Sequence, residues 1–420
     1  MTARAGMRPR RIVYVQYTNP AGYPPLEHSS QILAGRGCEV LFLAAAADGS
    51  RSLRFRTHPS TTVRRLPAFG AGLAQQFNYL CYVAWTLAVC IYWRPHWVYA
   101  SEPMACLPTL GIRFLTGCRT LYHEHDTPTY NSRSTLIQRL LRAARRRLAR
   151  SADICVLPEQ NRLRSFVEET GRTSGSSMCV WNCPGIEEVG PRRAAATDGA
   201  GAHFYFHGSI NVLRLPPTIL DALARVPRAT LTIVGYETIG SRGYMKSLLE
   251  KARQLGVSER LHHIGPLAER AEIMRRAGEA DVGFAFMPAH ADDINIRHMA
   301  GASNKPFDYL AVGTALLVSD LPGWREMYVE PGYAIACDPS DAESLTRAMT
   351  WCADNLAQVR AMGEAGRLRI AAEWNYERQF APVADEILAA SATMPTYGRD
   401  LGGRLMPTRA SGANTGSEDS

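Results

Sequence analysis

Short apolar runs alternate with helical stretches along this chain, and that alternation restricts the fold more than any other feature. Arg11–Val15 and Glu39–Leu43 are apolar runs of the kind buried in a parallel sheet, and a helix is expected between them from His28. This order predicts the opening of a doubly wound α/β sheet. The loop Asn19–Pro25 lacks the G-x-G-x-x-G spacing, so a dinucleotide fingerprint is absent.

The alternation restarts in the second half of the chain. Phe204–Ser209 predicts a strand and a turn, Ala229–Gly235 a further strand and Tyr333–Cys337 a late one, whereas Val180–Pro184 is expected to end the last strand of the first half. Glu187–Ala202 has the aperiodic Gly, Ala, Arg and Asp content of a linker. We therefore predict two similar α/β sheets that face a cleft.

The composition of the chain limits which binding partners and which cellular compartment are expected. A net charge of +8 favours phosphorylated or anionic partners. The ten cysteines show neither CxxC nor zinc-like spacing, so a reducing cytoplasm is the simplest setting, and the basic N-terminus shows no signal-peptide cleavage site. Tyr79–Trp93 is shorter than the roughly 20 apolar residues that span a membrane, and predicts a helix that is buried or partly membrane-facing.

A basic amphipathic helix is expected at Arg133–Arg150, where seven arginines accompany leucine and isoleucine at helical spacing. Such a helix fits an anionic membrane surface, and it fits equally well a solvated face in an arginine-rich protein. No aromatic residues interleave the charges, which argues against nucleic acid as a partner.

Thr120–Asp126 predicts a strand with a densely polar end. Alternation along the strand places Glu124 and Asp126 on one side and His123 and His125 on the other. Active sites of α/β proteins gather at this carboxyl edge. Three interpretations are open: an active-site edge, a hydrogen-bonded surface cluster, and a zinc site that would need further ligands.

Ser303–Gly313 predicts a turn, a short helix and a glycine before the buried strand Thr314–Val318. Ser303 or Asn304 can cap this helix, and its N-terminal N–H groups and partial positive charge favour a phosphate. Lys305 adds a cation and is one of only three lysines among 47 basic residues. The plainer interpretation of this pattern alone is an ordinary capped helix packed on a strand.

The order and spacing of these motifs resemble the GT-B glycosyltransferases, specifically the family-4 group of nucleotide-sugar-dependent enzymes, across residues 10–390. The implied fold class is α/β, with two Rossmann-like doubly wound domains facing a cleft. The implied parts are an acceptor domain at 1–186, a linker at 187–202, a nucleotide-sugar domain at 203–375, and a helix at 376–391 returning to the first domain. The Gly/Ser/Thr-rich tail at 392–420 is expected to be disordered.

The resemblance also implies roles for particular residues. His125 matches the histidine that lies at the sugar, with His123 as the fallback, and Arg214 matches the basic residue that clamps the diphosphate. Asn304 and Lys305 match a Ser-Asn-Lys run near the phosphates or sugar. The other expected donor contacts are Gly22, Gly208, Ser209, Gly235, Gly265 and Asp308.

Asp308 matches the second acid of the family's E-x7-E motif, which contacts the ribose. The first acid falls on Ala300, which cannot supply a carboxylate. This departure leaves two alternatives open besides a glycosyltransferase. One is a nucleotide-sugar epimerase, with Glu124 and Asp126 as the proton-abstracting candidates, and the other is a non-catalytic GT-B protein that binds a nucleotide sugar or a partner.

The resemblance implies transfer of a sugar from a UDP- or GDP-sugar to a saccharide or lipid-linked acceptor, with retention, in polysaccharide or glycolipid biosynthesis. The diphosphate gains negative charge as the glycosidic bond breaks, and Arg214, Lys305 and the helix start at Asn304 would stabilise that charge. No metal or other cofactor is expected. The expected location is the cytoplasm, peripheral on the inner membrane face through Arg133–Arg150.

Overall fold

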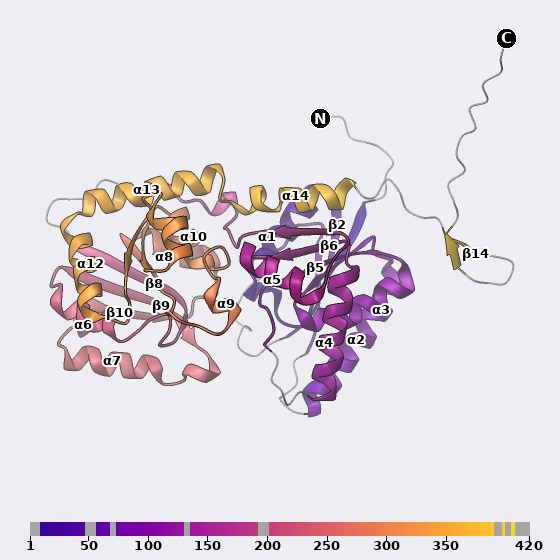
Figure 1. The fold of residues 1–420 in the computed structure, drawn as a ribbon, viewed down its shortest axis with the longest axis horizontal. Helices are drawn as coiled ribbons and strands as arrows, with labels where there is room; N and C mark the ends of the chain where they lie inside the picture. Colours follow the sequence, from indigo (N-terminus) through magenta and orange to yellow (C-terminus); the bar gives the residue numbers. More distant parts are fainter. Residues whose placement is uncertain are drawn as a thin grey trace, which may run out of the picture.

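A parallel sheet forms the centre of each half of the chain in a computed structural model, which describes residues 9–46, 56–67, 73–129, 135–191, 201–389, 397–399 and 405–407. The sheets belong to two lobes that lie side by side (Figure 1). The predicted α/β class with two doubly wound sheets is confirmed. Arg133, most of the expected linker and most of the expected tail lie outside the described residues.

Seven parallel strands make the first sheet, in the order β3-β2-β1-β4-β5-β6-β7. Apolar clusters cover both faces, which is why the central strands are continuous apolar runs in the sequence. The strands are β1 (Arg10–Gln16), β2 (Cys38–Ala45), β3 (Thr61–Leu66), β4 (Trp97–Ser101), β5 (Arg119–His123), β6 (Ile154–Leu157) and β7 (Ser176–Cys179). The helices are α1 (Pro24–Gly35), α2 (Leu73–Trp93), α3 (Cys106–Thr116), α4 (Leu136–Ser151) and α5 (Gln160–Thr170).

Six parallel strands make the second sheet, in the order β10-β9-β8-β11-β12-β13. In both sheets the strand order reverses beside the first strand, between β1 and β4 and between β8 and β11, and such switch points bind ligands. The strands are β8 (Ala202–Ile210), β9 (Ala229–Glu237), β10 (Leu261–Gly265), β11 (Val282–Ala285), β12 (Ala315–Ser319) and β13 (Ala334–Cys337). The helices are α6 (Thr218–Arg225), α7 (Tyr244–Gln254), α8 (Arg270–Gly278), α9 (Ile294–Arg297), α10 (Asn304–Ala311), α11 (Pro322–Trp324), α12 (Ala342–Asp354) and α13 (Leu356–Ala372).

The chain crosses between the lobes twice. The first crossing includes the short helix η4 (Ile186–Glu188), and the second leads from α13 into α14 (Tyr376–Ala389), along one side of the molecule (Figure 1). Helix α14 packs on α1, and Tyr376 and Phe380 belong to the apolar cluster on that face of the first sheet. Beyond α14, the two short strands β14 (Tyr397–Arg399) and β15 (Leu405–Pro407) pair antiparallel.

Two expectations about the first lobe were wrong or incomplete. Val180–Pro184 was expected to end the last strand, but that strand, β7, already ends at Cys179 and the chain then turns towards the second lobe. There the backbone N–H of Asn182 donates to the carbonyl of Gly301 at 3.0 Å, and its side-chain amide donates to Ala302 at 2.6 Å. Strand β3 was not foreseen, because it is a partly exposed edge strand and lacks an apolar run.

Helix α2 is half buried. Tyr82 and Cys90 are fully buried against the first sheet, whereas Phe77, Leu80 and Tyr92 are exposed, Tyr92 to 90%. No helix in the described part of the chain combines the length and the apolar content needed to cross a bilayer.

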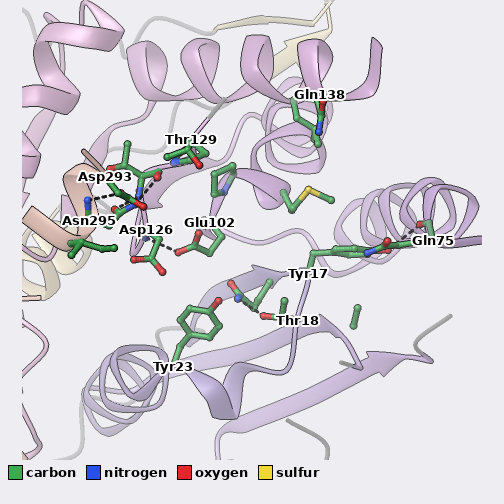
Figure 2. A pocket seen from close by; sticks show the side chains of 18 of the residues that line it. Tyr17, Thr18, Tyr23, Gln75, Glu102, Asp126, Thr129, Gln138, Asp293 and Asn295 are labelled. Atoms are coloured by element: carbon green, nitrogen blue, oxygen red, sulfur yellow. Dashed lines mark hydrogen bonds between the residues drawn. The ribbon is translucent and has the colours of Figure 1, made fainter. Parts of the chain in front are cut away.

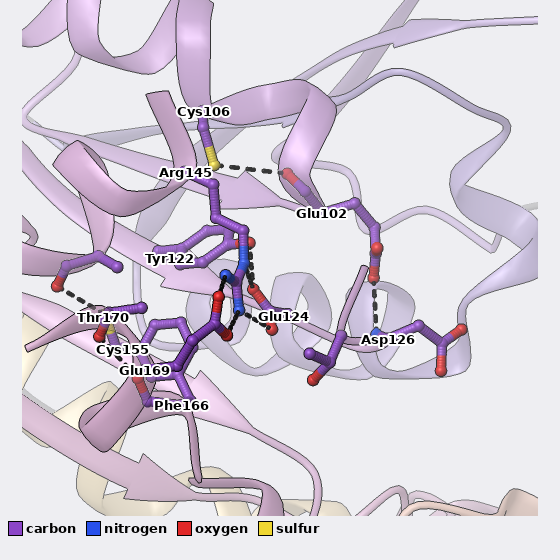
Figure 3. Close-up of polar contacts among 12 residues, drawn as sticks. Glu102, Cys106, Tyr122, Glu124, Asp126, Arg145, Cys155, Phe166, Glu169 and Thr170 are labelled. Carbon is purple, nitrogen blue, oxygen red and sulfur yellow. Dashed lines mark hydrogen bonds and ion pairs between the residues drawn. The ribbon is translucent and has the colours of Figure 1, made fainter. Parts of the chain in front are cut away.

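A buried arginine of the basic helix α4, Arg145, forms hydrogen bonds that connect this helix to the first sheet (Figure 3). Arg145 donates to both carboxylate oxygens of Glu124, from Nε at 2.6 Å and from Nη2 at 2.8 Å. It also donates to Glu169 of α5 at 2.9 and 3.1 Å, and Tyr122 donates its hydroxyl to Glu124 at 2.6 Å. The side chains of Arg145 and Glu124 are fully buried. Arg145 therefore belongs to the interior, unlike its neighbours Arg146 and Arg147, which are exposed.

We expect Glu124→Ala to lower the free energy of unfolding by about 3–5 kcal/mol, because Arg145 stays buried without its main partner. Glu169→Ala is the matched control and should cost about 1 kcal/mol or less, because Glu169 is partly exposed to water. Denaturant unfolding of both variants measures the difference. Equal losses would contradict a central role for the Glu124 pair.

Candidate active site

A cavity of about 960 Å³ opens at the switch point of the first sheet (Figure 2). Its walls come from the residues that follow β1, β4 and β5, namely 16–18, 102–104 and 126–129. The second lobe closes it with Arg214 and with residues around α9. The cavity therefore lies between the lobes, at the edge where ligands of α/β sheets bind.

Both histidines at the end of β5 are buried, and neither is among the residues that line the cavity, which begins at the next residue, Asp126. Their rings are 3.8 Å apart, which confirms that they share one side of the strand. Burial and the nearby Arg162 guanidinium lower the pKa of His125 to about 3, and burial also holds the pKa of His123 well below its usual value. Both rings are therefore neutral at physiological pH.

The two histidines differ in what they contact. His123 is hydrogen-bonded through Nδ1 to the hydroxyl of Tyr99 at 2.5 Å, deep in the sheet. The ring of His125 packs near Tyr23, a residue of the cavity wall, at 5.2 Å between centroids. Nε2 of each ring is buried and has no hydrogen-bond partner in the described part of the chain, so only the contacts with Tyr99 and Tyr23 distinguish the two histidines. His125 is therefore the better placed of the two to contact a molecule in the cavity.

Glu124 lies on the same side as Tyr122, to which it is hydrogen-bonded, as alternation predicted, whereas Asp126 lies beyond the end of β5 in completely different surroundings. Glu124 is enclosed by Arg145 and Tyr122, so for this residue the hydrogen-bonded interpretation holds, although the cluster is internal. Asp126 is exposed and lines the cavity. Among the described residues, no three histidines, cysteines or carboxylates are grouped so as to hold a metal ion.

Two cations meet at the switch point of the second sheet, at the end of β8. An added Cβ on Gly208 would lie 3.0 Å from Cε and 3.3 Å from Nζ of Lys305, so the ammonium sits directly over this glycine, whose φ is +113°. Nζ also lies 5.6 Å from the ring of Phe206. Burial, with the charge of Arg214 nearby, lowers the pKa of Lys305 to about 7. Burial likewise lowers the pKa of Arg214, while the carboxylate of Asp126 acts in the opposite direction.

Helix α10 begins beside these cations. Ser303 occupies the N-cap position, and its side chain makes no capping hydrogen bond, so the first N–H groups at Asn304 remain available to a ligand. Asn304 and Lys305 are both partly exposed. Gly208, Arg214, Lys305 and the start of α10 thus form one positively charged corner.

Asp308, in contrast, is only 1% exposed and is held in an ion-pair chain. Arg270 donates to its two oxygens at 2.6 and 3.1 Å, and His207 lies 3.3 Å away. Arg270 also binds Glu188, which in turn pairs with His28 of α1 at 2.9 Å. Burial alone would raise the pKa of Asp308, but Arg270 and His207 outweigh it and the pKa lies below its usual value. A ribose contact by Asp308 would have to replace part of the Arg270 pair.

Comparison with known proteins explains this two-lobed arrangement. Residues 26–171 match the Glycosyl transferase 4-like domain family, and residues 216–388 match the Glycosyl transferase-like family. The chain belongs to the GT-B glycosyltransferases. It is 23% identical over 403 residues to a protein of Mycobacterium tuberculosis named glycogen synthase, covering 88% of this chain and 93% of the relative.

Solved structures share the fold of this glycosyltransferase. A sucrose-phosphate synthase from Thermosynechococcus elongatus has a TM-score of 0.67 at 14% identity, with coverage of 91% of this chain and 100% of the other. HepE of Anabaena, solved with UDP and glucose, also has a TM-score of 0.67, at 16% identity and coverage of 90% and 100%. The family matches favour a glycosyltransferase over the epimerase alternative, and the enclosed position of Glu124 removes one of the two carboxyl groups which that alternative needs.

The remaining predicted donor contacts of this glycosyltransferase are three glycines and Ser209. Gly235 pairs with Gly208 across β8 and β9, and an added Cβ on Gly235 would lie 2.0 Å from the carbonyl oxygen of Gly208, so that position accepts only glycine. Ser209 is partly exposed beside it. Gly265 ends β10 with a φ of +81°, and Gly22 is exposed in the loop after β1.

The segment around Ala300 binds the lobes together instead of supplying an acid. The carbonyl of Ala300 accepts the hydroxyl of Tyr328 at 2.6 Å. An added Cβ on the next residue, Gly301, would lie 2.6 Å from the ring of Trp181 of the first lobe. Ala300 itself is partly exposed and packs against the apolar cluster of the second lobe, at the place where the family's first acid is expected.

Two residues of the cavity wall were missed in the sequence. Asn295 of α9 forms two hydrogen bonds with the backbone of Thr127 across the cleft. Its side chain accepts from the N–H at 2.7 Å and donates to the carbonyl at 2.8 Å. Glu102 follows β4, and its Oε1 accepts from the backbone N–H groups of His125 at 3.0 Å and Asp126 at 3.3 Å. Glu102 could have been predicted as a site residue, because it comes directly after a buried strand. The four-residue helix α9 offers no periodic signal for Asn295.

Proposed function

We propose that this glycosyltransferase binds a UDP- or GDP-sugar on its second lobe and transfers the sugar to a saccharide or lipid-linked acceptor in the cavity, during polysaccharide or glycolipid synthesis. The observation that carries the proposal is the positively charged corner of Gly208, Arg214, Lys305 and the start of α10. A nucleotide diphosphate is an anion that such a corner fits. HepE, with the same fold, has been solved with UDP and with UDP-glucose, which supports a donor of this class.

The charged corner would act on the leaving group. As the bond between sugar and diphosphate breaks, negative charge collects on the phosphate oxygens, and Arg214 and Lys305 stabilise it more strongly than in the ground state. Neutral His125 would donate or accept one hydrogen bond to the sugar through its free Nε2. Asn304 would supply the helix N–H groups.

We further propose that the reaction retains the anomeric configuration and needs no metal or other cofactor. The support is the family resemblance, in which the leaving phosphate takes the acceptor's proton on the same face of the sugar. The charge that a divalent ion would neutralise is here matched by the two side-chain cations of the corner.

The proposal is tested by incubating the protein with UDP-, GDP- and ADP-sugars and following thermal shift, then nucleotide release with and without saccharide acceptors. We expect release to depend on acceptor. Arg214→Ala should lower turnover by about 100-fold or more, because removing one such donor usually costs that much. Arg347→Ala, an exposed arginine on α12, is the matched control and should be unaffected.

Donor binding without turnover in the wild type would favour the non-catalytic alternative that Ala300 left open. Turnover by Arg214→Ala at the wild-type rate would remove Arg214 from the diphosphate clamp.

Donor affinity should also depend on pH through Lys305. Since burial lowers its pKa to about 7, the free side chain loses its charge above that pH, whereas a bound diphosphate favours the charged form. We therefore expect the Kd for UDP-glucose to be constant below about pH 6 and to rise up to about tenfold per unit above pH 7, with proton uptake on binding. Calorimetry in buffers of different ionisation enthalpy measures both effects.

Lys305→Met keeps the apolar stem and removes the titrating group. It should bind more weakly at low pH and lose the pH dependence and the proton uptake. An unchanged pH slope in this variant would assign the titration to another group.

We also propose that the protein works in the cytoplasm as a peripheral protein on the inner membrane face. Helix α3 packs against both α2 and α4, and the outer surface of these helices exposes Phe77, Phe114 and Leu136. The exposed Arg146 and Arg147 of α4 place positive charge on the same set of helices. Apolar side chains with adjacent arginines suit an anionic lipid surface. The ten cysteines are all unpaired thiols, which supports a reducing compartment.

Vesicle flotation tests the membrane proposal. The protein should bind phosphatidylglycerol vesicles more tightly than phosphatidylcholine vesicles, and the double variant Arg146→Glu/Arg147→Glu should weaken that binding by about tenfold or more, because each basic residue near the surface contributes about 1 kcal/mol. Arg164→Glu on α5 is the control and should bind as the wild type does. Equal binding to both lipids would contradict the proposal.

A further inference from the structure

We propose that the cavity of the first lobe takes an uncharged saccharide as acceptor, not a sugar phosphate, and that Glu102 holds one of its hydroxyl groups. The inference rests on the proposed function and narrows the acceptor class. Three observations carry it: the charges of the cavity wall, the backbone of Glu102 and the position of its carboxyl group.

The wall of the cavity holds more acidic than basic side chains. Of the described residues that line the cavity, Glu102, Asp126 and Asp293 carry carboxyl groups, and Arg214 alone carries a positive charge. Arg214 lies close enough to Lys305 to lower its pKa, which places it on the donor side. Arg162 lies 3.8 Å from Asp126 but is fully buried and does not line the cavity. A phosphorylated acceptor would therefore find no cation on the described part of the first-lobe wall.

The polar groups of the wall match sugar hydroxyls instead. Five amide side chains line the cavity, and one of them, Gln16, has a buried Oε1 without a hydrogen-bond partner among the described residues. Amides and carboxyl groups accept from hydroxyls, and amides also donate to them. Tyr17 and Tyr23 add aromatic surface suited to the C–H face of a sugar ring.

Glu102 occupies a backbone conformation that side chains rarely adopt. Its φ is 70° and its ψ is 161°, a region populated almost only by glycine. The backbone is held there by its N–H, which donates to His123 at 3.1 Å, and by its carbonyl, which accepts from Ala105 at 3.0 Å. Strained residues of this kind cluster at functional sites, because the surrounding structure must hold them in place.

The strained backbone presents the carboxyl group to the cavity. Oε1 is fixed by the two N–H groups of His125 and Asp126, whereas Oε2 has no partner within the described part of the chain. Figure 2 shows Glu102 beside Asp126 and across from Tyr23, at the same opening. Burial, and then the charges of Asp126 and Glu124, raise the pKa of Glu102 well above its usual value. Whether protonated or ionised, this carboxyl group accepts from a sugar hydroxyl and offers no cation to a phosphate.

The experiment is saturation-transfer NMR on the full chain with UDP, using a mixture of neutral mono- and disaccharides and the 6-phosphates of the same monosaccharides. We expect neutral sugars to bind at least tenfold more tightly than the phosphates. Glu102→Gln should weaken neutral sugars about tenfold and leave the Kd for UDP unchanged, and Glu102→Gly, which suits the backbone conformation, should do the same. Glu168→Gln, an exposed residue of α5, is the control. Gln75→Arg, which places a cation at the cavity wall, should raise phosphate binding about tenfold.

Phosphates that bind as tightly as neutral sugars overturn this inference, as does the absence of neutral-sugar binding or a Glu102→Gln variant that behaves like Glu168→Gln. These outcomes are separable from the fate of the proposed function. A wild-type protein that binds no UDP contradicts the donor proposal, whereas one that binds UDP and prefers phosphorylated sugars contradicts only the assignment of the acceptor.

Discussion

The contact of Arg270 with two carboxylates is the interaction on which the arrangement of the lobes depends. Its guanidinium binds Asp308 of α10 on one side and Glu188 of the interdomain segment on the other, and Glu188 reaches His28 of α1. Each carboxylate is largely removed from water, so it needs its cation to offset the lost hydration. Helix α1, the crossing segment and α10 are therefore linked in series. The same link sets the start of α10, where Lys305 lies.

A charge difference across the cleft follows from this arrangement. The second lobe brings Arg214, Lys305 and the start of α10 to its switch point, whereas the first lobe brings Glu102 and Asp126 to its own. Under the proposed function, an anionic donor is favoured on the second lobe, whereas the described part of the first-lobe wall offers an anion no cation. Asn295 joins the two walls through the backbone of Thr127.

The sequence predicted the fold well where burial is complete. The central strands of both sheets and the helix after Ser303 lie where the apolar runs indicated, because parallel strands covered on both faces must be continuously apolar. Prediction failed at the edge strand β3 and at Val180–Pro184, where the pairing partner, and not the local pattern, decides the structure. In the site, the family resemblance predicted Arg214 and Lys305 as donor-binding residues, and the two do lie close together. Their contacts with a nucleotide sugar remain predictions.

By itself, the sequence determined two doubly wound sheets and the order of the motifs along them, because the apolar periodicity of a buried strand is written locally in the chain. Tertiary structure alone decided which polar residues face the cleft. Glu124 and Asp126 are two residues apart and look alike in the sequence. Arg145, 21 residues further along, encloses the first in the interior and leaves the second at the cavity. Which of the two acids is buried depends on a partner that is close only in the folded chain, so the local sequence pattern cannot predict it.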